Sequence, residues 1–470
     1  MKHRTTEEQY EYMTGSSIPP LIAKLAIPTI VSMLITSVYN MADTFFVSKL
    51  GTSATGAVGI FFSIMTIIQA VGFTLGNGAG AYISRKLGQK KVEEANKALS
   101  TAFFTAFAVG LLICAGGLLF LDPLIRALGA TDTIFPFARD YAKYIFLGAP
   151  FMCTSFVMNN SLRAEGSALL SMVGIGTGGV LNMFLDPLFI FTFDMGIAGA
   201  AIATIISQFI SFSIMLSQFL RKRSHASLHY KYFTFTLAMY KEIFRTGFPT
   251  FCRQGLASVA NIIMNIAAAS FGDAAIAAMS VVQRVFMFIM SASMGFAQGF
   301  QPFAGYNYGA GFYNRVVKGF TFCIKVIVTA TCAIGVLGFI SAPNIIAIFR
   351  KEDAEVIAIG ALAFRMQCLI LPLQGTTIVS NMLFQSLGRA KEAMVFSLSR
   401  QGLFFIPLIL ILPRTIGLFG VQSAQAIADA LAFIALLPVT IRFVRQLKQK
   451  EQIDGKESEV SCLKKTKEAN

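Results

Sequence analysis

The sequence predicts an all-α polytopic membrane protein with 12 transmembrane helices in two parallel-repeat six-helix lobes. First, 55% of the 470 residues are hydrophobic and only 13% are charged, whereas soluble domains carry about 25% charged residues. Second, apolar runs long enough to cross a bilayer, about 20 residues each, recur along the chain. Third, the two halves share proline and glycine positions at an offset of 221 residues.

The apolar runs define the expected helices in order. A backbone without hydrogen-bond partners is too costly in hydrocarbon for open structures other than helices. A closed barrel is excluded because the runs show no alternation of polar and apolar residues. We expect spans near 21–45, 54–83, 98–121, 137–158, 168–191, 197–220, 243–271, 275–302, 319–341, 356–380, 393–413 and 418–441.

Polar stretches divide the chain into five parts. The first twenty residues show no apolar core followed by a cleavage site, so the first apolar run is expected to be a retained helix. The expected parts are a cytoplasmic N-tail (1–20), an N-lobe (21–220), a cytoplasmic linker (221–242), a C-lobe (243–445) and a basic cytoplasmic C-tail (446–470).

The net charge of +15 indicates topology instead of nucleic-acid binding, because the basic residues lie between apolar runs. A cytoplasmic N-terminus places 27 Lys and Arg residues on the inner side and 6 on the outer side. Cytoplasmic loops carry the excess of Lys and Arg. We therefore expect a multi-pass protein of the cell membrane with both termini in the cytoplasm.

The repeat is visible residue by residue. At an offset of 221, Pro28 matches Pro249, Gly51 matches Gly272 and Gly196 matches Gly417. With one extra residue, Pro150 matches Pro372 and Gly166 matches Gly388. Six helices per half start both halves from the same side of the membrane, which makes them parallel repeats. Such pairs characteristically rock about a central site.

Acidic residues inside the spans are few and therefore informative, because charge in lipid is costly. Asp43 lies in the first span and Asp186 in the fifth, with Asn182 on the same helix face as Asp186. Thr204 in the sixth span adds a hydroxyl. If these spans meet, the four residues can surround one Na⁺ or share a proton. The alternative is that each carboxylate pairs separately with a hydroxyl or with water.

Other intramembrane polar residues are weaker candidates. Pro28 lies 15 residues before Asp43 and is expected to hinge or statically kink its helix. Arginines near span ends have a simpler explanation, since long basic side chains reach toward the interface. The candidates for lining a central cleft are Asn40, Arg253, Gln254, Arg284 and Gln367.

Enzyme chemistry is not indicated. The sequence has no phosphate-binding loop of the GxxxxGK[ST] type, and all three His residues lie outside the spans. The seven cysteines show no CxxC spacing. The Gly-rich segment 76–80 is expected to serve close helix packing. No cofactor is expected beyond the coupling ion, H⁺ or Na⁺.

Several segments together resemble the multidrug and toxic compound extrusion (MATE) family over about residues 21–445. They are YNMADTFFVSKLG (39–51), GNGAGAYISRKLG (76–88), APFMCTSFVMNNSLRAEG (149–166), NMFLDP (182–187) with GIAGAAIAT (196–204), QPFAGYNYGAG (301–311) and NMLFQSLGRAKEA (381–393).

The resemblance implies two lobes in a V shape that export cationic or amphipathic drug-like compounds by antiport with H⁺ or Na⁺, as a monomer. It also implies that the DinF-type coupling site maps onto Asp43, Asn182, Asp186 and Thr204. Another branch of the family has acidic coupling residues in spans 7 and 10, where this chain has none. A lipid-linked saccharide flippase and a non-transporting receptor or scaffold remain as alternatives.

Overall fold

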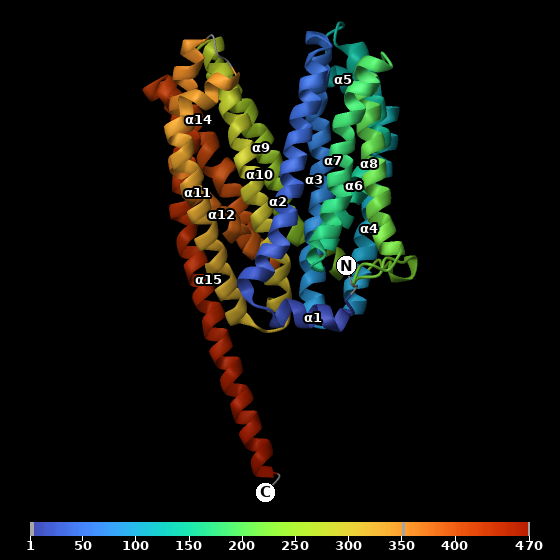
Figure 1. The fold of residues 1–470 in the computed structure, drawn as a ribbon, viewed down its shortest axis with the longest axis vertical. Coiled ribbons are helices and arrows are strands. Elements are labelled where there is room, and N and C mark those ends of the chain that lie inside the picture. The colour runs from blue at the N-terminus through green and yellow to red at the C-terminus, as the bar shows by residue number, and fades with distance from the viewer. Residues whose placement is uncertain (1–3, 350–352, 469–470) are drawn as a thin grey trace.

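The computed structural model describes residues 4–349 and 353–468, with residues 453–468 described by their backbone alone. Within these ranges every regular element is helical. Figure 1 shows two groups of long helices that stand side by side and diverge toward the top of the view. The short helix α1 (Thr6–Gly15) lies across the lower end.

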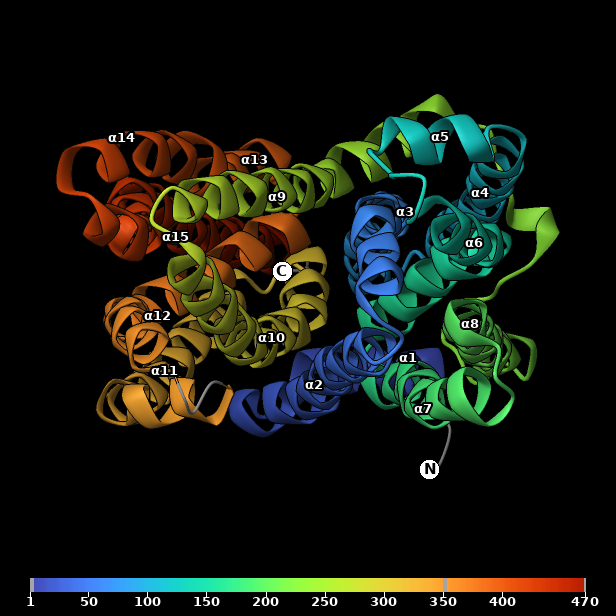
Figure 2. The same cartoon turned by 90° about the horizontal axis from the view of Figure 1, so that it is seen from above.

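The two groups are the two expected lobes, and Figure 2 shows them as separate clusters when seen from above. The N-lobe contains α2 (Ile18–Ser48), α3 (Thr52–Gly88), α4 (Val92–Leu119), α5 (Leu121–Ala127), α6 (Phe135–Ala164), α7 (Ala168–Pro187), the π-helix η1 (Leu188–Thr192) and α8 (Gly196–Leu220). The C-lobe contains α9 (Leu237–Ala269), α10 (Asp273–Gly309), α11 (Tyr313–Phe349), α12 (Ala354–Ser386), α13 (Ala390–Leu398), the π-helix η3 (Ser399–Phe405), α14 (Ile406–Ile416) and α15 (Leu418–Glu468).

The prediction of an all-helical, two-lobed membrane protein is confirmed. In the described ranges, ten helical segments are long and apolar enough to cross a membrane. Helices α6 and α9, with 30 and 33 residues, pack among them and complete the expected twelve. These two are more polar because α6 ends in Asn159, Asn160 and Arg163, and α9 carries charged residues over its first turns.

The helix boundaries differ from the expected spans in two places. The expected span 98–121 crosses a break at Phe120 between α4 and α5, and the span 243–271 runs past the end of α9. Elsewhere the helices extend beyond the apolar runs. At the C-terminus α15 continues without a break past residue 446, where the tail was expected to begin.

The repeat has a backbone counterpart in the glycines. Gly51 and Gly272 have φ of 106° and 97° and directly precede α3 and α10, which both have 37 residues. Gly196 and Gly417 have φ of 54° and 63°, and Gly166 and Gly388 have φ of 89° and 74°. Side-chain-bearing residues rarely adopt these angles. Each matched pair therefore marks the same turn in both lobes.

The lobes meet along a seam in the lower half of the molecule. Helix α3 packs on α9, and α2 packs on α10. A methyl group on Gly247 of α9 would overlap the Thr74 carbonyl of α3. Asn77 and Gln385 donate to Thr250 Oγ1 over 3.2 and 2.7 Å. Small residues let the two backbones approach closely, so the seam seals this end.

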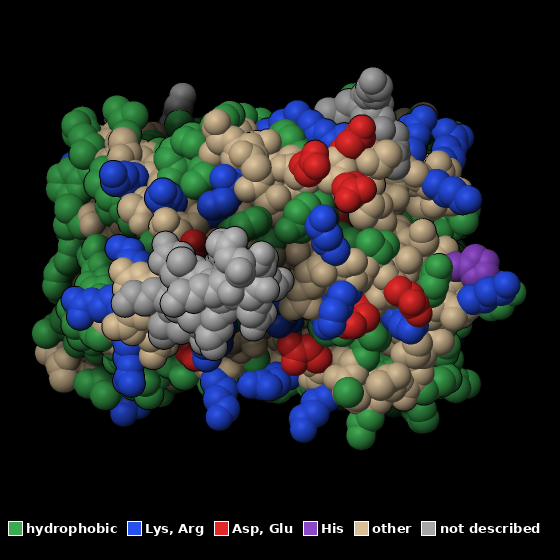
Figure 3. Space-filling view, turned by 90° about the horizontal axis from the view of Figure 1, so that it is seen from below, with side chains coloured by type: hydrophobic (Ala, Val, Ile, Leu, Met, Phe, Trp, Pro, Cys, Tyr) green, Lys and Arg blue, Asp and Glu red, His purple; other side chains and the backbone are tan. Residues whose placement is uncertain are grey.

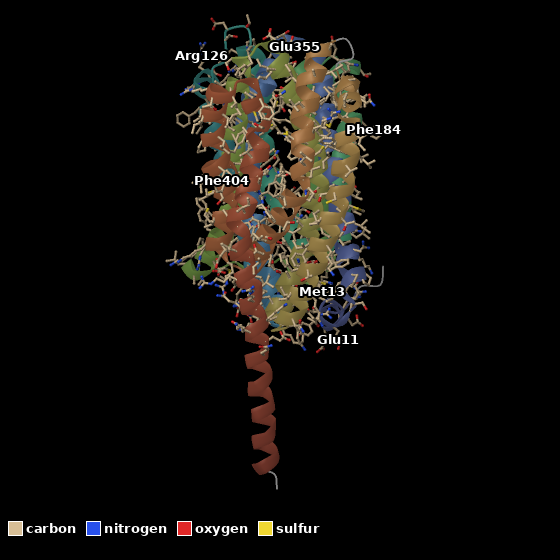
Figure 4. The ribbon with its side chains drawn as sticks, turned by 90° about the vertical axis from the view of Figure 1, so that its left-hand side faces the viewer. Glu11, Met13, Arg126, Phe184, Glu355 and Phe404 are labelled. Carbon is tan, nitrogen blue, oxygen red and sulfur yellow. The ribbon has the colours of Figure 1, made fainter. Side chains whose placement is uncertain are left out.

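Two segments cover the sealed end. Helix α1 bridges the lobes: Gln9 Nε2 donates to the Glu165 carbonyl of the N-lobe over 3.0 Å, and Asn307 Nδ2 of the C-lobe donates to the Met13 carbonyl over 3.1 Å. Arg315 of α11 also donates to the Ser16 carbonyl over 2.7 Å. Figure 4 shows Met13 and Glu11 at this end, with Arg126 and Glu355 at the opposite one.

The linker between the lobes is the second covering segment. Its anchor is the fully buried Glu165, whose Oε2 accepts hydrogen bonds from Ser224 Oγ, His225 N and Ala226 N over 2.7, 2.9 and 3.0 Å. Ser227 N donates to Asn96 Oδ1 of α4 over 2.7 Å. The linker thus lies fixed on the N-lobe. Figure 3 shows Lys and Arg side chains over this face, with fewer acidic ones.

Candidate cation-coupling site

Asp43 lies in the upper part of the N-lobe, five residues before the end of α2. Its side chain is half-buried, yet Oδ1 is buried and has no hydrogen-bond partner among the described residues. A buried carboxylate oxygen without a donor is costly. This atom is therefore positioned to receive a proton or a cation.

Asp186 lies one residue before the end of α7 and is completely buried, and Asn182 is nearly so. Asn182 Nδ2 donates to Asp186 Oδ1 over 3.1 Å and to Thr204 Oγ1 of α8 over 3.4 Å. This bifurcated amide ties α7 to α8. It leaves Asn182 Oδ1 and Asp186 Oδ2 buried and without a donor from residues 4–349 and 353–452.

The structure brings Asp43 and Asp186 close enough to interact electrostatically. Tyr39, one turn before Asp43 on α2, and the buried Tyr141 of α6 lie within the field of both carboxylates. Sequence reasoning missed these two tyrosines. The spacing of four residues between Tyr39 and Asp43 was an available signal, whereas nothing in the sequence indicated Tyr141.

The four residues named from the sequence therefore lie together, and the described part of the chain offers no donor to three buried acceptor oxygens, on Asp43, Asn182 and Asp186. Acceptor-only oxygen clusters suit hard monovalent cations or protons. Two neighbouring carboxylates cannot both stay ionised in a low-dielectric site without a neutralising charge. The role of these residues stays a prediction, while their proximity is a property of the fold.

The C-lobe carries no copy of this site. At the matching positions it has Met264, Leu403, Pro407 and Gln425. Its buried carboxylate is Asp429, which accepts from Arg400 Nε over 2.6 Å and from Gln374 and Gln425 over 3.2 and 3.1 Å. Arg400 belongs to η3, inside the expected span 393–413. In the C-lobe the charge of Asp429 is therefore neutralised by Arg400 of the same lobe.

The candidates for lining a cleft differ in exposure. Asn40 and Arg284 are exposed, Arg253 and Gln254 are half-buried, and Gln367 is buried with Oε1 unpaired among the described residues. Arg253 and Arg400 lie near enough to repel each other. Contact with a substrate stays a prediction for all five.

Pro28 lies inside α2, which is continuous from Ile18 to Ser48. Ser32 Oγ donates to the Pro28 carbonyl over 2.9 Å. The neighbouring Ala26 and Ile30 backbones contact Gly299 and Gly295 of α10 at the seam. The proline therefore lies where α2 leaves the sealed region and rises toward Asp43. Its action as a hinge stays a prediction.

Comparison with known proteins agrees with this architecture. The MatE family model matches residues 28–188 and 249–411, so each lobe carries one copy, and the chain belongs to the MATE family of transporters. It is similar to multidrug export protein MepA of Staphylococcus haemolyticus, with 29% identity covering 92% of this chain and 96% of that protein.

Two further likenesses cover nearly the whole chain. MepA of Staphylococcus saprophyticus subsp. saprophyticus is 27% identical over 92% of this chain and 95% of its own. A solved structure described as the outward-facing conformation of a multidrug resistance MATE family transporter of the MOP superfamily aligns with a TM-score of 0.90. That alignment has 26% identity and covers 95% of this chain and 100% of the other.

Proposed function

We propose that this protein is a secondary active multidrug exporter that exchanges cationic or amphipathic organic compounds for H⁺ or Na⁺. The observation that carries the proposal is the cluster of three buried oxygens, on Asp43, Asn182 and Asp186, that receive no hydrogen bond from the described residues. Entry of a monovalent cation or protonation relieves the repulsion between the two carboxylates. Since Asp43 is on α2, whose lower half packs against the C-lobe, its neutralisation is coupled to the position of the lobes.

The conformation supports the direction of transport. The lobes are sealed at the end that carries α1, the linker and an excess of Lys and Arg (Figure 3). The positive-inside rule assigns that end, with both termini, to the cytoplasm. Asp43 and Asp186 then lie on the outer side of the seal, where external cations have access. The likeness to an outward-facing MATE structure fits this assignment.

The proposal is tested with purified protein in liposomes that contain a fluorescent cationic dye. An imposed pH gradient or Na⁺ gradient, each varied alone, identifies the coupling ion. Asp43→Asn and Asp186→Asn are expected to lower gradient-driven dye transport at least tenfold. An amide carries no negative charge that H⁺ or Na⁺ could neutralise, so ion binding no longer changes the charge of the site. Asp140→Asn, an exposed acid on α6, serves as the matched control and keeps full transport.

Wild-type transport in both amide variants would overturn the coupling site. Dye transport that ignores both gradients in the wild-type protein would overturn the antiport mechanism itself. Dye binding measured without any gradient separates the two, since the amide variants are expected to bind dye normally.

A further inference from the structure

A small polar cavity lies inside the seam, below the proposed coupling site. It offers about 20 Å³ of space to a water-sized particle, somewhat more than one water needs. Both lobes contribute to it, through α3 and α6 on one side and α10 and α12 on the other. Its polar lining consists of Asn77, Ser84, Asn160, Arg163, Gln298, Gln301 and Ser386.

Arg163 supplies the only formal charge in this lining. It is 4% exposed, and its two terminal nitrogens donate to the amide oxygens of Asn160 and Gln298. Its Nε–H is buried and has no acceptor among the described residues. No carboxylate of the described residues forms an ion pair with it.

The surroundings therefore leave a guanidinium charge uncompensated. Buried ions are normally paired, because neutral dipoles replace only part of the lost hydration. Asn160 and Gln298 offer their oxygens to Arg163, which turns their amide nitrogens away from it. Most donors of the lining are already used: Asn160 Nδ2 donates to the Phe156 carbonyl, Asn77 Nδ2 to Thr250 and Gln301 Nε2 to Gln385. Gln298 Nε2 makes no hydrogen bond to a described residue. The cavity therefore offers two unused donors, Arg163 Nε and Gln298 Nε2, beside one positive charge.

We propose that this cavity binds a monatomic anion of the chloride class. The anion compensates Arg163 and accepts hydrogen bonds from Arg163 Nε and from Gln298 Nε2. The volume excludes larger oxyanions and organic anions. Because Gln298 and Gln301 belong to the C-lobe and Arg163 to the N-lobe, the complete site exists only while the lobes are sealed. The anion therefore stabilises the sealed conformation.

The experiment measures the thermal stability of the full-length protein in chloride, bromide or gluconate at equal Na⁺ concentration and pH. Halide is expected to raise Tm saturably, by about 1–2 °C at ten times its Kd. Gln298→Glu places a carboxylate beside Arg163 and is expected to abolish the halide response while the protein stays folded. Lys318→Gln, which removes an exposed cation on α11, keeps the full response.

A crystal grown in bromide is expected to show an anomalous scattering peak beside Arg163. A Tm that does not distinguish halide from gluconate would overturn the proposal, and so would an undiminished halide response in Gln298→Glu. A peak at Arg163 that refines as water alone would also contradict it. None of these measurements depends on transport. Failure of the anion proposal can therefore be distinguished from failure of the proposed coupling site.

Discussion

Glu165 shows how one buried side chain fixes a connecting segment. It follows α6 directly, is completely buried, and accepts three hydrogen bonds from the linker. Burial raises the pKa of Glu165 to about 7, against the opposing effect of these hydrogen bonds. A buried carboxyl group with a raised pKa binds its proton more tightly in the folded chain than in the unfolded one.

The sign of the pH dependence follows. Between the ordinary Glu pKa of about 4.3 and about 7, the folded protein holds more protons than the unfolded one. Stability therefore falls as the pH rises through this window. Glu165→Gln is expected to flatten this slope in Tm measured from pH 4.5 to pH 8. Glu93→Gln, at an exposed ion pair, retains the slope, and an unchanged slope in Glu165→Gln would refute the assignment.

At the proposed coupling site, the four polar residues could be picked out from the sequence because ionisable groups are rare in apolar spans; their role stays a prediction. Asn182 and Asp186 share a helix face by spacing alone. The proximity of Asp43 to Asp186 depends on the packing of α2 against α7, which spacing does not encode. Arg163 was missed as a site residue because its burial arises from the seam between lobes.

Helix α1 lies within residues 1–20, which were expected to form a polar tail. A local signal for it existed in the capping box of Thr5 and Glu8, whose reciprocal hydrogen bonds are 3.2 and 2.8 Å long. Its function as a strap between the lobes was not predictable, since Gln9, Asn307 and Arg315 are far apart in the chain.

The hydrogen bonds between α1 and the two lobes lead to a testable prediction. Gln9→Ala removes the hydrogen bond to the N-lobe, and a single hydrogen bond contributes about 1 kcal/mol. The ratio of sealed to unsealed molecules is expected to fall about fivefold. Double electron–electron resonance measures this ratio from the distances between spin labels at residues 91 and 318. Glu11→Ala, exposed on the same helix, is the control. Identical distance distributions in wild type and Gln9→Ala would show that α1 does not stabilise the sealed state.

For the molecule as a whole, the two-lobed architecture followed from hydropathy and from the repeated glycines, which mark turns that only glycine adopts easily. The conformational state did not follow, because one sequence encodes every state of the cycle. The seam explains which state is described: backbones approach closely at Gly247 and Gly299, and side-chain amides complete the seal at Thr250.

The seam predicts the effect of adding volume between the lobes. Gly247→Val forces a side chain against the Thr74 carbonyl and is expected to destabilise the sealed state by about 1–3 kcal/mol. Hydrogen–deuterium exchange in residues 74–88 should then rise. Gly255→Val on the same helix has open space beside it and should leave exchange unchanged. Equal exchange in both variants would mean that the seam does not hold the lobes together.

The asymmetry between the lobes limits the work that one cycle can perform. Of the acidic residues inside the expected spans, Asp43 and Asp186 form no ion pair with a described residue, whereas Arg400 neutralises Asp429. If the proposed coupling uses these two carboxylates, one turnover admits at most two monovalent ions. Export of a singly charged organic cation then moves at most one net charge inward, which supplies about 2.3 kcal/mol at 100 mV. The membrane potential alone can sustain about a fiftyfold concentration ratio for such a compound, and any steeper ratio must draw on the chemical gradient of the ion.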